Sequence, residues 1–293
     1  MAKAVRDARR EERPAAKARE PLRFLFGENW IRFLKTVDEE RIAQAASSLQ
    51  SMLELQTLSG KRFLDAGSGS GLFSLAAKRL GAEVVSFDCD PDSVSCALAL
   101  RSRFDREDGR WKIEQGSVLD REYLSKLGTF DIVYSWGVLH HTGDMWNALD
   151  LIGARVANGG LLFASIYNDQ GTRSRVWRKV KRLYNRLPRG ARWTVLIPAF
   201  VYLWLPPLLI DIALGRGLQS LRHYQRNRGM SVWRNAVDWI GGYPYEVAKP
   251  EEVIEFCRSR GLVLRKLKTV MGGHGCNEFV FSRLAASWQS PNA

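Results

Sequence analysis

The residues Asp65-Ala-Gly-Ser-Gly-Ser-Gly71 carry the most chemical information in this chain of 293 residues. They follow a short apolar run at Phe63 and Leu64 and precede a segment with helical apolar spacing, which predicts a strand, a glycine turn and a helix. Glycines let a backbone adopt positive φ and approach a ligand closely, and the N–H groups of the following helix then face that ligand. A second predicted strand ends in Asp88, an acid placed to hold ribose hydroxyls. The pattern therefore predicts a nucleotide-like cofactor.

The spacing of this turn distinguishes two kinds of nucleotide site. A dinucleotide site reads G-x-G-x-x-G, whereas this turn reads D-x-G-x-G-x-G with the acid first. The turn resembles motif I of the class I S-adenosylmethionine-dependent methyltransferases. That resemblance implies that Asp65, Gly67, Gly69 and Gly71 surround the methionine end of the cofactor and that Asp88 holds its ribose. The full set of cofactor-binding residues it implies is Asp65, Gly67, Ser68, Gly69, Gly71, Asp88, Cys89, Ser117, Val118 and Trp136.

Three later segments extend the resemblance. Residues 116–120 look like the motif at the edge of the adenine, with Ser117 and Val118 flanking the ring. Residues 130–141 look like the fourth strand running into an active-site turn, and residues 158–167 look like a Gly-Gly turn followed by the fifth strand. The sequence Gly-Val-Leu-His-His in that active-site turn is most similar to the ubiquinone- and menaquinone-biosynthesis methyltransferases. The alternative is another doubly wound enzyme.

Histidines at the predicted sheet edge are the candidates for catalysis. Methyl transfer to a hydroxyl requires an aligned acceptor and removal of its proton, and histidine is the side chain best suited to proton transfer near neutral pH. His140 and His141 follow the fourth strand, and His274 follows the sixth, which reaches the same edge if it is parallel. We predict His141 as the base, with His140, His274 and Asn168 as further catalytic candidates. The alternatives are structural hydrogen bonds for the histidines and a turn or helix cap for Asn168. The spacing of these residues matches no metal motif, so no metal is predicted.

The order of elements predicts the fold class. We expect an α/β protein with a doubly wound, seven-stranded Rossmann-like sheet, a helical lead-in over residues 22–58 and a helical insert between the fifth and sixth strands. The resemblance implies that the final strand runs antiparallel between the fifth and sixth. The predicted parts are a disordered charged tail (1–20), the cofactor-binding core with its lead-in (21–168), the insert (169–249), a final helix and two strands of the core (250–284) and a tail (285–293).

The charge of the chain is concentrated in the predicted insert. Residues 171–234 hold fourteen Lys and Arg and one acid, Asp211, for a net charge of +13. The whole chain also carries +13, so the remaining residues sum to zero. A charge localised in this way predicts an anionic partner, which is a lipid headgroup, a phosphorylated substrate or a nucleic acid.

An uncharged run of eighteen residues, 193–210, lies inside this basic insert. Its length reaches the threshold for a membrane span, but strands of one sheet flank it on both sides and Pro198, Pro206 and Pro207 should break the helix. We therefore expect broken helices that lie on the surface of a membrane, with Trp193, Tyr202 and Trp204 at the interface. The alternatives are the core of a helical cap over the active site and a dimer interface.

Composition narrows the remaining choices. The four cysteines have no zinc or disulfide spacing, and residues 1–20 have no apolar signal segment, so we expect a cytoplasmic protein that is peripheral at the inner face of the membrane. The predicted activity is O-methylation of an amphipathic or lipid-linked small molecule, such as a quinone precursor or a glycan-lipid. The alternative is an RNA methyltransferase that uses Arg175, Arg178 and neighbouring aromatic residues to hold nucleic acid. A cofactor-binding regulator without enzymatic activity is a third possibility.

Overall fold

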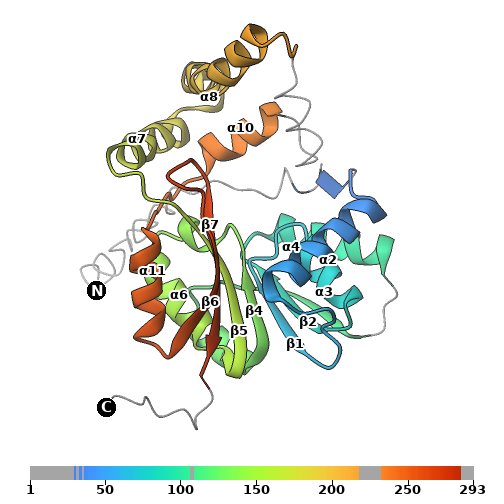
Figure 1. The fold of residues 1–293 in the computed structure, drawn as a ribbon. Coiled ribbons are helices and arrows are strands. Elements are labelled where there is room, and N and C mark those ends of the chain that lie inside the picture. Colours follow the sequence, from blue (N-terminus) through green and yellow to red (C-terminus); the bar gives the residue numbers. More distant parts are fainter. Residues whose placement is uncertain (1–29, 31–32, 35, 106–108, 218–231, 285–293) are drawn as a thin grey trace, which may run out of the picture.

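A single mixed sheet of seven strands forms the centre of the computed structural model, which describes residues 30, 33–34, 36–105, 109–217 and 232–284 (Figure 1). The strand order is β3-β2-β1-β4-β5-β7-β6, and β7 pairs antiparallel with both β5 and β6. This confirms the predicted fold class and the predicted place of the final strand. The strands are β1 (Arg62–Ala66), β2 (Glu83–Asp88), β3 (Trp111–Gln115), β4 (Phe130–Ser135), β5 (Val156–Tyr167), β6 (Leu262–Lys268) and β7 (Cys276–Arg283).

Helices cover both faces of the sheet (Figure 1). The helices α2 (Glu39–Leu53), α3 (Leu72–Arg79) and α4 (Pro91–Phe104) pack on one face, and α5 (Arg121–Leu127), α6 (Met145–Gly153) and α11 (Pro250–Arg258) pack on the other. Their starts follow from local sequence. Asp90 accepts a hydrogen bond from the Asp92 N–H at 3.0 Å and is followed by proline, while Asp120 accepts one from the Tyr123 N–H at 2.9 Å. Such caps satisfy N–H groups that have no partner within the helix.

Several predicted boundaries differ from the structure. The fifth strand begins at Val156, before the Gly-Gly pair, because β5 continues along β4 through a register shift opposite Phe130. The final helix ends at Arg258, and β7 starts at Cys276, three residues before the predicted start. The predicted tails 1–20 and 285–293, and residues 218–231 of the predicted insert, lie outside the described residues.

The insert forms a small helical layer over the carboxyl ends of the parallel strands (Figure 1). It contains α7 (Thr172–Arg186), the short 3-10 turn η2 (Arg189–Ala191), α8 (Trp193–Ala213) and α10 (Val232–Gly241). A separate apolar cluster holds these helices together, with Trp177 from α7, Leu196 from α8 and Ile240 from α10. The insert is therefore anchored to the sheet edge where the predicted site lies.

The expectation that α8 would be broken is wrong, because its 21 residues form one helix with Pro198, Pro206 and Pro207 inside it. A proline removes one backbone hydrogen bond and bends a helix, but the hydrogen bonds before and after it can continue. Within the described residues, the segment Arg189–Ala213 is also the one that is long and apolar enough to cross a bilayer by length and composition.

Candidate active site

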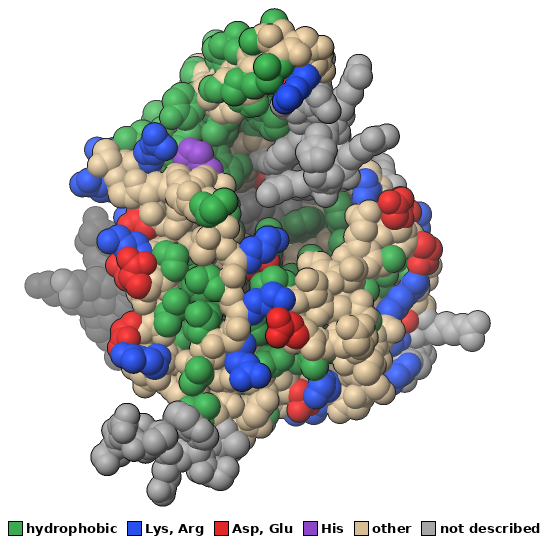
Figure 2. Space-filling view, viewed as in Figure 1, with side chains coloured by type: hydrophobic (Ala, Val, Ile, Leu, Met, Phe, Trp, Pro, Cys, Tyr) green, Lys and Arg blue, Asp and Glu red, His purple; other side chains and the backbone are tan. Residues whose placement is uncertain are grey.

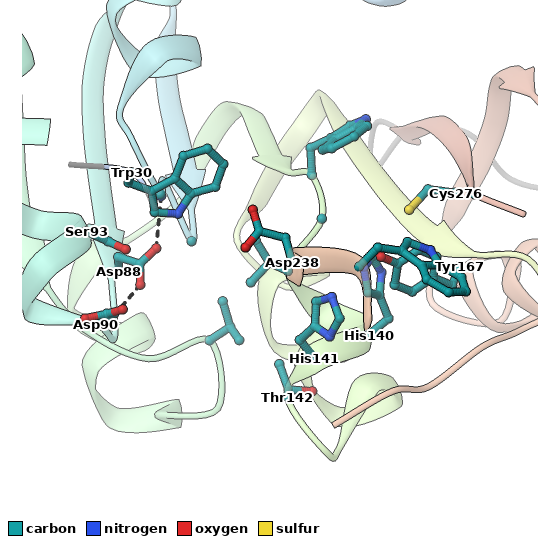
Figure 3. A pocket seen from close by; sticks show the side chains of 18 of the residues that line it. Trp30, Asp88, Asp90, Ser93, His140, His141, Thr142, Tyr167, Asp238 and Cys276 are labelled. Carbon is teal, nitrogen blue, oxygen red and sulfur yellow. Dashed lines mark hydrogen bonds between the residues drawn. The ribbon is translucent and has the colours of Figure 1, made fainter. Parts of the chain in front are cut away.

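A cavity of about 830 Å³ opens at the carboxyl edge of the sheet, beneath the insert. Its wall combines the turn after β1, the ends of β2, β4 and β5, the turn before β7, and the facing sides of α8 and α10. Figure 3 shows the cavity from close by, with Asp88 and Asp90 on one side and His140, His141 and Tyr167 on the other. The cavity thus has a half formed by the glycine turn and a half formed by the histidines and the insert.

The glycine turn forms the first half of the cavity. Gly67 and Gly69 lie in its wall with φ of +88° and +53°, a region in which residues with a side chain are strained. The Gly67 and Ser68 N–H groups donate to the carbonyl of Phe87 at 2.9 and 3.0 Å, which fixes the turn against β2. A Cβ atom at Gly67 would lie 2.5 Å from the Val138 methyl groups. The turn therefore leaves a backbone surface that a ligand can approach closely.

Asp88 lies at the end of β2 and connects this turn to the next loop. Its carboxylate accepts hydrogen bonds from the Gly69 and Asp90 N–H groups, both at 2.9 Å. The carboxylate lies in the cavity wall, where its oxygens can also accept hydrogen bonds from hydroxyl groups of a ligand. The predicted cofactor residues that also line this half of the cavity are Cys89, Ser117, Val118 and Trp136.

Three of the residues predicted to contact the cofactor lie outside the cavity wall. Asp65 is 2% exposed and accepts a hydrogen bond from the Ser74 hydroxyl at 2.5 Å, and burial raises its pKa to about 7. Gly71 has a φ of +79°, and a Cβ atom there would lie 2.9 Å from the Cβ of Ala97. The Ser68 hydroxyl is also buried. In this structure these residues shape the turn from behind, and their contact with the cofactor stays a prediction.

The three predicted histidines meet in the second half of the cavity. The Nδ1 atom of His141 lies 2.7 Å from the carbonyl oxygen of Pro244, in the segment that follows α10. Because a carbonyl oxygen only accepts hydrogen bonds, Nδ1 carries the proton, and in the neutral ring Nε2 carries the lone pair. The geometry therefore fixes the tautomer in which Nε2 of His141 can accept a proton.

His140 occupies a different environment beside its neighbour. It is 1% exposed, and its ring lies 4.0 Å from the ring of Tyr167. Burial lowers the pKa of His140 well below its usual value, and the adjacent His141 lowers it further, so the ring is neutral. Its Nδ1 atom is buried without a hydrogen-bond partner in the described part of the chain. A neutral ring at the wall can bind or orient an acceptor, but it is a poor base.

His274 completes the group from the turn before β7. Its ring meets the rings of Trp177 and Trp239 edge-on, with centroids 6.0 and 5.6 Å away. Burial lowers its pKa, with the nearby charges of Arg173 and Lys181 acting in the same direction. These contacts place His274 where the insert meets the sheet.

Asn168, the fourth catalytic candidate, lies away from the cavity wall. Its side-chain oxygen accepts a hydrogen bond from the amide of Asn277 at 3.0 Å, and it is 9% exposed. This bond ties the end of β5 to β7, and it supports a structural role. Asp169 caps the following turn by accepting from the Gly171 N–H at 2.8 Å.

Glu246 also stabilises a turn. Its carboxylate accepts hydrogen bonds from the N–H groups of Gly143 at 2.9 Å and Met145 at 3.3 Å. The backbone N–H of Glu246 donates to the carbonyl of His140 at 3.0 Å. The segment after α10 therefore holds the histidine turn in place through both its backbone and this side chain.

The insert closes the second half of the cavity. The wall residues it contributes are mostly apolar, and they are Leu203, Trp204 and Pro207 from α8 and Ala236, Asp238 and Trp239 from α10. Among the described residues of these two helices, Asp238 alone brings a carboxylate to the wall. Asp238, Tyr167 and Trp30 also line the cavity, but the sequence analysis did not select them as site residues. Their proximity along the chain to the predicted motifs is the one signal that could have indicated them.

A buried lysine joins the insert to the site. Lys181 of α7 is fully buried, and its ammonium group donates a hydrogen bond to the carbonyl of Trp239. The same group lies 4.2 Å from the centroid of the Trp239 ring and 4.8 Å from that of Tyr245. Burial lowers the pKa of Lys181 to about 7. Lys181 thus fixes α10, and with it Asp238, above the histidines.

Comparisons with known proteins agree with this geometry. A family described as a methyltransferase domain matches residues 37–200. The ubiquinone biosynthesis O-methyltransferase of Methylocella silvestris is 34% identical over 111 residues, which cover 38% of this chain and 41% of that protein. The enzyme with the same name from Hahella chejuensis is 33% identical over 172 residues, or 56% of this chain and 69% of that protein. The match to the first of these relatives spans about two fifths of its length.

Solved structures share the fold. An O-methyltransferase family protein from Burkholderia thailandensis has a TM-score of 0.52 at 12% identity, covering 89% of this chain and 59% of that one. Magnesium protoporphyrin IX methyltransferase from Synechocystis PCC 6803, solved with bound SAH, has a TM-score of 0.50 at 13% identity, covering 89% and 88%. The chain belongs to the methyltransferase domain family.

The first half of the cavity fits S-adenosylmethionine, the cofactor that the resemblance of the glycine turn implies. The backbone at Gly67 and Gly69 leaves a space in the cavity wall that a Cβ atom would fill. Asp88 lies at the end of the neighbouring strand β2, and its carboxylate oxygens can accept hydrogen bonds from ribose hydroxyls. Ser117 and Val118 lie further along the same wall, where the resemblance expects the adenine. The residues that would hold the cofactor are thus all present on one side of the histidines.

Proposed function

We propose that this methyltransferase transfers a methyl group to a hydroxyl oxygen of an amphipathic or lipid-linked small molecule. The observation that supports this most strongly is the continuity of the cavity from Gly67 and Asp88, past His141, to the apolar wall made by α8 and α10. An acceptor that lies against this wall presents its polar end to the histidines. Quinone precursors and glycan-lipids have this combination of a hydroxyl-bearing head and an apolar tail.

The chemistry proposed for the chain is acceptor alignment and proton removal. S-adenosylmethionine, when bound, supplies an electrophilic methyl group. His141 would accept the proton of the acceptor hydroxyl at Nε2, because its Nδ1–H is committed to the carbonyl of Pro244. The neutral ring of His140 and the carboxylate of Asp238 would orient the polar head between them. The apolar residues of α8 would exclude water from the tail.

The names of the relatives support oxygen as the atom methylated. Both curated relatives described above are named ubiquinone biosynthesis O-methyltransferases. The insert helices α8 and α10 contain most of the apolar wall. The apolar wall thus supports an amphipathic acceptor, and the relatives' names together with the histidine turn support methylation of oxygen.

An RNA acceptor fits the wall less well. Bases stack on aromatic side chains within a positively charged groove. The acceptor half of this cavity offers aromatic rings at Trp204 and Trp239, but it also carries the acid Asp238. A carboxylate in that position would repel a phosphate backbone. RNA is therefore the competing outcome that the experiment below must separate.

The test uses a phenol with a prenyl tail, the same phenol without the tail, and transfer RNA as acceptors for methyl-labelled S-adenosylmethionine. We expect an O-methyl product from the phenols, with a lower KM for the tailed phenol. His141→Asn keeps a side-chain N–H near the position of Nδ1 but removes Nε2, so we expect kcat to fall by roughly 10²–10⁴-fold while cofactor affinity is unchanged. Full activity in His141→Asn would show that His141 acts only through its hydrogen bond to Pro244 and is not the base. Label found in RNA alone would overturn the proposed acceptor class.

A further inference from the structure

Helix α8 has two different apolar sides. One side carries Leu203, Trp204 and Pro207, which line the cavity. The opposite side is exposed at helical spacing along the whole helix, with exposed fractions of 60% at Trp193, 48% at Ile197 and 47% at Leu205. The other large apolar side chains exposed on α8 are Val201, Tyr202, Leu209, Ile210 and Ile212. A soluble protein rarely exposes a continuous apolar surface of this length, so it indicates a binding partner.

Charge next to this apolar stripe indicates what the partner is. Seven exposed cations lie on α7 and the turn before α8, and no ion pair joins them to a carboxylate within the described residues; they are Arg173, Arg175, Arg178, Lys179, Arg182, Arg186 and Arg189. Figure 2 shows hydrophobic side chains gathered over α8 and Lys or Arg side chains beside them over α7. An apolar stripe bordered by cations fits the acyl chains and anionic headgroups of a membrane surface.

The topology determines how α8 meets the membrane. Only 17% of its most apolar window is buried, and its length of about 30 Å would reach across a hydrocarbon core. However, β5 precedes it and β6 follows it in the same sheet, and its inner side packs on α7 and α10 through Leu196 and Ala199. A single crossing would place the two strands on opposite sides of the bilayer. The helix must therefore lie along the surface.

We propose that α8 docks this enzyme on an anionic lipid bilayer, with the exposed stripe in the interface and the opposite side forming the wall of the acceptor cavity. The same helix then separates the membrane from the site by the thickness of one helix, and an apolar tail has a short path between them. This inference rests on the proposed function for the nature of the acceptor. It adds that the enzyme takes up the acceptor at the membrane surface. The four free cysteines fit the reducing, cytoplasmic side of the membrane.

The test is co-sedimentation of the full chain with vesicles of phosphatidylcholine, alone or mixed with phosphatidylglycerol. We expect binding to the mixed vesicles that weakens with salt. The variant Ile197→Glu, Val201→Glu, Leu205→Glu changes only exposed positions outside the cavity wall, and it should abolish binding. Its matched control is Leu98→Glu, Val263→Glu, Leu267→Glu, which adds the same three charges at apolar positions outside the insert that are 41%, 38% and 37% exposed, and it should bind like the wild type.

A second pair of variants tests the cations. Arg175→Glu, Lys179→Glu, Arg182→Glu should weaken partition to the mixed vesicles on the order of a hundredfold, since each cation near an anionic surface contributes several-fold. The control Arg121→Glu, Lys126→Glu, Arg258→Glu makes the same change of charge at exposed positions outside the insert, and it should have little effect.

Two results would overturn membrane docking. One is a wild type that does not bind vesicles, or control variants that lose vesicle binding as much as the insert variants do. The other is a dimer in sedimentation velocity that the α8 variant dissociates, without any binding to vesicles, which would assign the stripe to a second copy of the chain. Calorimetric titration with S-adenosylmethionine reports on folding of every variant. Vesicle binding requires no methyl transfer, so its failure is distinct from a failure of the proposed reaction.

Discussion

Replacement of Gly67 by alanine should disturb both the fold and the cofactor half of the cavity. The backbone there has a φ of +88°, and a Cβ atom would lie 2.5 Å from both methyl groups of Val138. A left-handed backbone with a side chain costs about 1–2 kcal/mol, and an overpacked contact costs about 1–3 kcal/mol, so Gly67→Ala should lower the free energy of unfolding by about 2–5 kcal/mol. Urea unfolding followed by tryptophan fluorescence measures this change.

A double-mutant cycle with Val138→Ala separates the two causes. Removing the Val138 methyl groups leaves its Cβ at 3.0 Å from the new atom, so most of the overlap should disappear while the backbone strain remains. We expect the double variant to be about 1–3 kcal/mol more stable than the sum of the two single changes predicts. Additive effects, or a Gly67→Ala protein as stable as the wild type, would refute the contact between the turn and Val138.

Three further predictions concern acids around the site. Asp88→Asn removes the carboxylate that accepts from the Gly69 and Asp90 N–H groups, so calorimetry should show S-adenosylmethionine affinity reduced roughly 10–100-fold, with Asp92→Asn as a control that changes little. The raised pKa of Asp65, about 7 against an ordinary value of 3.8, means that burial favours its protonated form; the stability it contributes is fully present below about pH 4 and is lost as the pH rises through about 7. Asp65→Asn should flatten that part of the stability–pH curve, and an unchanged slope would show that Asp65 is ionised throughout. Glu246→Ala leaves the N–H groups of the histidine turn without their acceptor, so unfolding by urea should show a loss of about 1–3 kcal/mol and assays a lower kcat at unchanged cofactor affinity; unchanged stability would refute the bracing role.

Local sequence patterns were sufficient to predict the sheet and to place the glycine turn, Asp88 and the histidines at one cavity. Alternating strands and helices fix a parallel core, and the carboxyl ends of parallel strands share one edge, so Asp88, His140 and His141 had to converge. His274, in the turn before β7, lies at the same edge because β6 runs parallel to β5, as expected. These features depend on spacing along the chain and on one topological rule.

The direction of individual side chains could not be predicted in the same way. Asp65 and Gly67 belong to one motif, but Asp65 points at Ser74 behind the turn and Gly67 faces the cavity, because packing of α3 and α4 decides which side of the turn is buried. Asp238 is separated from His141 by almost a hundred residues, and only the fold of the insert brings both to one wall. The continuous α8 shows that one helix can contain three prolines that local propensity disfavours.

The most direct test of the central claim is the fate of a labelled methyl group. Methyl-labelled S-adenosylmethionine is incubated with the purified protein and, in separate reactions, with lipid extract and RNA from its host. We expect the label in an organic-soluble product as a methoxy carbon, and its loss in His141→Asn. Label confined to RNA or to the protein, or an equal yield from His141→Asn, would contradict an acceptor cavity in which His141 activates the hydroxyl of an amphipathic molecule.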